Sequence, residues 1–189
     1  MKSPKRLEGS YIPENQMNLI FESRMVWRDL ATWIHAYLIS VYSNFDNKSA
    51  VEEKIDAMVS KNGYIIGLIF GQQNEEQYVQ LLSEYVSPFK ELVDAQINGE
   101  DVDEYIERLY ENGNQGAAFF SRVNPFWLES EWKTLIHQFI QMNIDESTAF
   151  LNKDYVKNIE IYDRNLKQAL KMGDCYSKGL IEYLTYARK

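Results

Sequence analysis

Two histidines, His35 and His137, are the only imidazole side chains in the sequence, so a metal ligand or general base of that kind must be one of them. Each lies among apolar residues at helical spacing, where a carboxylate from another helix could face it. The candidates for such a metal site are His35, His137, Glu22, Glu84, Asp145, Asp163 and Asp174. The pattern favours the plainer interpretation, in which each histidine is partly buried and satisfied by one hydrogen bond.

The usual sequence signatures of metal and covalent catalysis are missing. A ferritin-like di-iron site needs Glu-x-x-His on two helices, and the residues three positions before the histidines are Thr32 and Thr134. The zinc-protease pattern and the nucleophile elbow are missing as well. Cys175 is the only cysteine, which excludes a cysteine-rich zinc site. We therefore expect no cofactor.

Residues 62–73 read NGYIIGLIFGQQ and contain three glycines spaced four apart, Gly63, Gly67 and Gly71. A phosphate loop would need a lysine and then Ser or Thr after the last glycine, but Gly71 is followed by two glutamines. A membrane-helix dimer would need about twenty apolar residues around the glycines, many more than this stretch supplies. The spacing therefore indicates close helix packing, with Gly71 suited to a left-handed helix exit.

Apolar residues recur at three- and four-residue steps through most of the chain, and no segment shows sustained strand-like alternation. The helical segments are 17–41, 51–59, 74–98, 102–121, 130–150 and 154–186. Pro88 should kink the third segment, and Gly113 and Gly116 weaken the fourth. We predict an all-α, antiparallel helical bundle of four long helices plus shorter connecting helices. Residues 1–15 are expected to form a flexible tail, and 16–189 a single domain.

Polar and aromatic residues also follow the bundle seam. Arg24 could pair with Asp163 or Asp174 across two helices, unless these side chains are solvated at the edge of the seam. In the last segment, five residues fall at seven-residue steps: Tyr155, Tyr162, Ala169, Tyr176 and Tyr183. This tyrosine row is typical of a core or interface, and packing of a second copy against it would give a homodimer.

Composition restricts the partners. The chain has 189 residues and a net charge of −8, and such an acidic surface repels phosphate, so we expect no nucleic-acid partner. No apolar run approaches the roughly 18 residues of a membrane span, so we expect no membrane partner. A single cysteine and the lack of a secretory signal predict a cytoplasmic location.

Three stretches together resemble a family of small, all-helical, uncharacterised proteins from Bacillus- and Clostridium-like bacteria. The stretches are FESRMVW at 21–27, FFSRVNPFW at 119–127, and IYD with ALKMGD between 161 and 174. Members sometimes carry the label acetylglutamate kinase, which this sequence does not support because it lacks the strands and glycine-rich phosphate loops of amino-acid kinases.

The resemblance implies a metal-binding bundle interior built from acid–histidine pairs. Here the histidine positions hold Arg24, Tyr85 and Phe139, and two acid positions hold Asn114 and Gln115. The family residues that this sequence keeps are Asn112, Asp163 and Asp174. The resemblance thus implies a degenerate member that has lost most of any metal site.

These observations favour a non-enzymatic module that binds a protein or a small molecule through its aromatic-rich interior. The alternative is a ferritin-like metal-binding protein or metal-dependent enzyme with a degenerate site. A histidine pointing inward with two or more carboxylates around it would favour the enzyme, whereas singly bonded histidines would favour the binding module.

Overall fold

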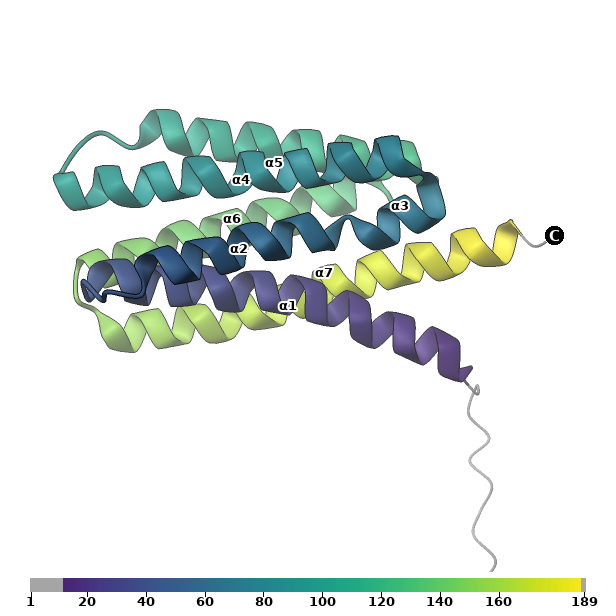
Figure 1. Cartoon of the computed structure of the whole chain (residues 1–189), viewed down its shortest axis with the longest axis horizontal. Coiled ribbons are helices and arrows are strands. Elements are labelled where there is room, and N and C mark those ends of the chain that lie inside the picture. The colour runs from purple at the N-terminus through teal and green to yellow at the C-terminus, as the bar shows by residue number, and fades with distance from the viewer. Residues whose placement is uncertain (1–11, 188–189) are drawn as a thin grey trace, which may run out of the picture.

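The computed structural model describes residues 12–187, which form seven helices and no strand (Figure 1). The helices are α1 (Glu14–Tyr42), α2 (Lys48–Asn62), α3 (Tyr64–Phe70), α4 (Gln72–Asn98), α5 (Asp103–Val123), α6 (Glu129–Leu151) and α7 (Tyr155–Tyr186). The predicted all-α bundle is confirmed. Five helices have 21 residues or more, whereas four long helices were predicted. Most of the predicted tail, residues 1–11, lies outside the described residues.

The long helices run side by side along one direction (Figure 1). In this view α4 and α5 form the top of the bundle, α1 and α7 the bottom, and α2 and α6 lie between them. Helix α6 contacts four of the other helices, α1, α4, α5 and α7. Within the described residues, no helix combines the length and the apolarity needed to cross a bilayer.

The predicted packing role of the glycine stretch is confirmed at the α3–α4 contact. A Cβ atom added to Gly63 would lie 2.7 Å from Cγ2 of Val79 on α4, closer than real Cβ contacts allow. Gly71 joins the two helices with φ of 90°, a region that favours glycine. Its ψ of 162° is extended rather than helical, so the predicted left-handed helix exit is wrong at this residue.

Helices α1 and α7 touch through their backbones. A Cβ atom added to Gly173 would lie 2.6 Å from the Cα atom of Arg24. Beside this contact, the Arg24 guanidinium donates two hydrogen bonds to the carboxylate of Asp174, which confirms one of the two predicted pairings. Asp163 is exposed. The close approach depends on a glycine at position 173, because any side chain there would push α1 away.

The tyrosine row of α7 lies mostly against its own chain. Ala169 and Tyr176 are buried, and Tyr183 packs 4.9 Å from the ring of Phe70, measured between centroids. Tyr162 stacks on His35 at 3.8 Å, and Tyr155 is exposed. The row therefore fills an intramolecular seam, and its spacing no longer argues for a second copy of the chain.

Candidate functional site

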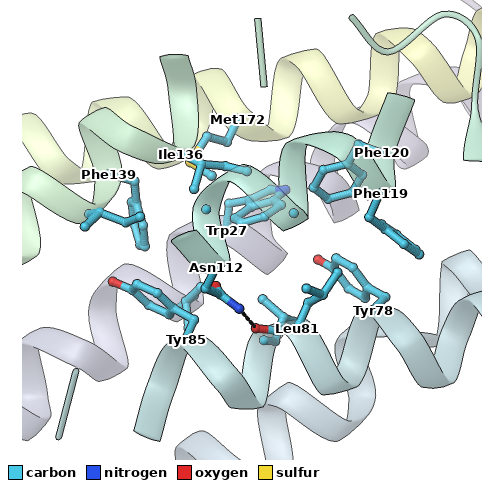
Figure 2. Close-up of a pocket in the computed structure, with 15 residues that line it drawn as sticks. Trp27, Tyr78, Leu81, Tyr85, Asn112, Phe119, Phe120, Ile136, Phe139 and Met172 are labelled. Carbon is cyan, nitrogen blue, oxygen red and sulfur yellow. Dashed lines mark hydrogen bonds between the residues drawn. The ribbon is translucent and has the colours of Figure 1, made fainter. Parts of the chain in front are cut away.

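An apolar cavity of about 50 Å³ lies in the bundle interior, where side chains from α1, α4, α5, α6 and α7 meet (Figure 2). Its exposed lining is entirely apolar. Six aromatic side chains form much of its wall: Trp27, Tyr78, Tyr85, Phe119, Phe120 and Phe139. A space of this volume exceeds the roughly 10–15 Å³ that one water needs, but an apolar wall offers water no hydrogen bond.

Helical spacing explains why these side chains converge. Tyr78, Leu82 and Tyr85 lie four and three residues apart on α4 and share one buried face. Phe139 and Ile140 close the opposite side from α6. The cavity thus depends on the relative placement of several helices, each of which looks like an ordinary amphipathic helix in the sequence.

The two glycines of α5 in the cavity lining differ in the space beside them. A Cβ atom added to Gly113 would meet Cδ1 of Ile140 at 2.9 Å, so that position is filled by its neighbours. At Gly116 an added Cβ would meet only Cδ1 of Ile136, at 3.5 Å, which is an ordinary contact. The segment of α5 that is weakest by helix propensity is therefore helical and forms a wall of the cavity.

A rigid aromatic cluster supports one end of this cavity. The rings of Phe120 and Trp132 stack with centroids 4.0 Å apart, and Trp27 lies 5.7 Å from Trp132. Trp127 packs on Tyr176 at 5.0 Å and donates its indole N–H to the carbonyl of that residue. Aromatic pairs at these distances add to the free energy gained from burial alone. The wall is therefore well fixed on this side.

On the other side, Tyr85 joins the cavity to a chain of buried polar side chains. Its hydroxyl accepts a hydrogen bond of 2.8 Å from Nδ2 of Asn143, whose Oδ1 accepts another of 2.8 Å from Nδ2 of Asn165. Burial raises the pKa of Tyr85 well above its ordinary value. Oδ1 of Asn165 is buried and has no hydrogen-bond partner among the described residues.

His35 reaches the same polar region, where its half-buried ring contacts the buried carboxylate of Glu146 on α6. Nδ1 of His35 contacts Oε1 of Glu146, whose side chain is 0% exposed, and Tyr162 covers the imidazole ring. Oε2 of Glu146 has no partner among the described residues. His35 is therefore the one predicted site residue that points inward, and one carboxylate faces it.

The other predicted site residues do not join this pair. His137 bonds to Oδ1 of Asn114 at 3.0 Å, and burial together with Lys133 lowers its pKa. Glu22, Glu84 and Asp163 are exposed, and Asp174 binds Arg24. Within residues 12–187, no three metal-ligating side chains come together. The candidate metal-ligating residues are therefore not brought together at one place.

Sequence reasoning missed Glu146, although a signal for it exists. Phe139, Glu146 and Phe150 follow one another at seven- and four-residue steps, so the carboxylate lies in the apolar row of its helix. A charged residue in such a row is costly to bury unless a partner is present. That pattern could have pointed to an interior ion pair, though not to His35 as the partner.

Comparison of the chain with protein-family models, with curated proteins and with solved structures gave no match in any of the three. The family resemblance described above therefore stays a prediction. The case for a function consequently depends on the geometry of the cavity and of the polar region beside it.

Proposed function

We propose that this protein is a non-enzymatic binding module whose interior cavity holds a small apolar molecule, or the apolar end of a larger one. The observation that carries the proposal is the cavity of about 50 Å³ whose exposed lining surface is apolar. Protein interiors are otherwise close-packed, and an empty space forfeits dispersion contacts around its whole wall. A guest that fills the space regains those contacts without displacing ordered water.

The cavity volume defines the size of the guest. An engineered apolar cavity of about 150 Å³ binds benzene or xenon and stays dry without them. The present cavity, at about 50 Å³, suits a xenon atom or a short alkyl group rather than an aromatic ring. If the guest is larger, the rest of the molecule would have to lie outside the cavity.

The ferritin-like alternative has weaker support. It requires several carboxylates around a histidine, and the geometry around His35 supplies one, Glu146. A singly bonded histidine is what the binding-module hypothesis expects. We further propose a cytoplasmic location for the module, since one cysteine suits a reducing compartment. A protein partner or a second copy of the chain would bind elsewhere on the surface, because the tyrosine row is occupied within the chain.

Xenon titration followed by methyl NMR tests the proposal. We expect saturable shifts of the Met172, Leu82 and Ile136 methyl signals, which surround the cavity. Gly116→Leu should abolish these shifts by filling the space. Ala118→Leu is the matched control, since it adds the same side chain at an exposed position two residues along α5 and should leave the shifts intact. Unsaturable shifts in the unsubstituted protein would overturn the proposal.

A further inference from the structure

A second depression lies directly outside the cavity, between α4 and α5. This α4–α5 groove has a volume of about 420 Å³ and is lined by polar and charged residues, among them Glu84, Arg108, Glu111 and Asn112. Asn112 also lines the interior cavity. Asn112 therefore lies at the boundary between the groove and the cavity.

The Asn112 side chain is kept in its position by one hydrogen bond to α4. Nδ2 of Asn112 donates to the carbonyl oxygen of Leu81 on α4 at 3.0 Å (Figure 2). Next to it, Gly113 and Gly116 each cost an α-helix about 1 kcal/mol relative to alanine, so this part of α5 has low intrinsic helix stability. Rotation of Asn112 away from Leu81 would join the groove to the cavity without unfolding either helix.

The charges of the groove indicate the head group of a guest. Glu84 and Glu111 contribute two carboxylates to its lining. The only cation of that lining, Arg108, already donates to Glu91 at 2.7 Å, and this contact lowers the pKa of Glu91. The chain as a whole carries a net charge of −8. A positively charged group is therefore attracted to the groove, whereas a carboxylate is repelled.

We infer that the guest is a short-chain alkyl amine, with its apolar end in the cavity and its ammonium group in the α4–α5 groove beside Glu84 and Glu111. This inference depends on the proposed function, since the cavity must accept an apolar group first. The Asn112 side chain acts as a gate: it lies between the ammonium position in the groove and the apolar end in the cavity, and it must rotate to connect them. Charge complementarity in the groove gives the specificity, and the cavity selects the length of the apolar end.

The test compares n-butylamine, n-butanol and butyrate, which share a chain length and differ in charge, in NMR titrations at low salt and near-neutral pH. Because partly exposed ion pairs contribute up to about 1 kcal/mol, the amine should bind about threefold to fivefold more tightly than the alcohol. Butyrate should bind more weakly than the alcohol. The double variant Glu84→Gln/Glu111→Gln should remove the advantage of the amine and leave butanol binding unchanged.

Two controls keep the interpretation specific. Glu100→Gln/Glu107→Gln also removes two negative charges, but from exposed positions outside the groove lining. This variant should retain the preference for the amine. Asn112→Ala should accelerate exchange of bound butanol at least severalfold, because the gate is gone. Unchanged exchange would overturn the role of Asn112.

The outcomes also separate this inference from the proposed function. Saturable binding of xenon and butanol, with no preference for butylamine, would overturn the inference and leave the apolar cavity function standing. A failure of xenon, butanol and butylamine alike would overturn both. An amine preference that survives Glu84→Gln/Glu111→Gln would place the ammonium group outside the groove and contradict the inference.

Discussion

The cavity and the polar region occupy neighbouring parts of one interior, and the same helix builds both. On α6, Phe139 and Ile140 face the cavity, and Asn143 and Glu146, less than two turns further on, face the polar region. The cavity region has space and an apolar exposed surface, and the indole N–H of Trp27 in its wall has no hydrogen-bond partner among the described residues. The other contains buried polar atoms without partners, including Oε2 of Glu146 and Oδ1 of Asn165.

This difference assigns different roles to the two regions. Unfilled apolar volume costs stability and is recovered when a guest binds, so the cavity is the region suited to binding. A buried carboxylate and its hydrogen-bonded neighbours have strict geometric requirements, and they fix how α1, α6 and α7 align. We therefore expect substitutions in the polar region to affect folding first, and substitutions around the cavity to affect binding first.

The largest effect should come from removing the buried carboxylate that His35 contacts. Among the described residues this is Glu146, and Glu146→Ala should lower the free energy of unfolding by about 1–3 kcal/mol, because the His35 ring loses its hydrogen-bond partner. Glu146→Gln keeps the shape and one hydrogen bond, and should cost less. Urea denaturation near neutral pH measures both. Glu84→Ala, at an exposed position, should stay within about 0.5 kcal/mol, and a similar cost for Glu146→Ala would refute the structural role of the pair.

A smaller effect should appear at alkaline pH, at the residue that joins the two regions. Burial raises the pKa of Tyr85 in the folded protein above the value of about 10 for an unfolded tyrosine. The contribution of protonated Tyr85 to the free energy of unfolding is therefore complete below about pH 10. At higher pH this contribution declines by about 1.4 kcal/mol per pH unit.

Denaturant titrations at a series of alkaline pH values test this decline. Tyr85→Phe should show a shallower loss of stability with pH, because its ring has no hydroxyl proton to release. Buried Tyr78 and Tyr176, whose pKa values burial also raises, continue to titrate in that variant. Identical slopes for the two proteins would mean that Tyr85 reaches solvent and that the junction is not closed.

The smallest effect should be a gain in stability at the cavity wall. Gly116→Ala improves helix propensity by about 1 kcal/mol, and its Cβ meets only Cδ1 of Ile136 at 3.5 Å. It should stabilise the protein and weaken xenon binding. Gly173→Ala is the contrasting substitution and should destabilise, since its Cβ would meet the backbone of Arg24 at 2.6 Å. Thermal unfolding measures both variants. Melting temperatures that shift in the same direction would contradict the difference in space between the two positions.

The helices and some of their contacts could be predicted from the sequence, because they depend on local periodicity. The close α3–α4 packing at Gly63 and the pairing of Arg24 with Asp174 are examples. The partner of His35 could not be predicted, since Glu146 lies 111 residues away and nothing local connects the two. The tyrosine row was interpreted as a possible dimer surface because spacing shows which residues share a face, not which helix covers that face.

The cavity could not be predicted from the sequence either. Gly113 and Gly116 could be recognised as weak points of a helix, and their composition is consistent with either a hinge or a tolerated defect. Only the contacts of each position separate the two glycines: Gly113 is closely covered by Ile140, whereas Gly116 faces space. Volume is a property of several helices together, and no single segment encodes it.

The most direct measurement of the central claim is a crystal structure of the full chain under xenon pressure. We predict one strong xenon site between Trp27, Gly116 and Phe139, where the side chains surround the apolar space. The same experiment on Gly116→Leu should show that site empty. Absence of xenon from this position in the unsubstituted protein would contradict the claim that the interior of the bundle is a binding site.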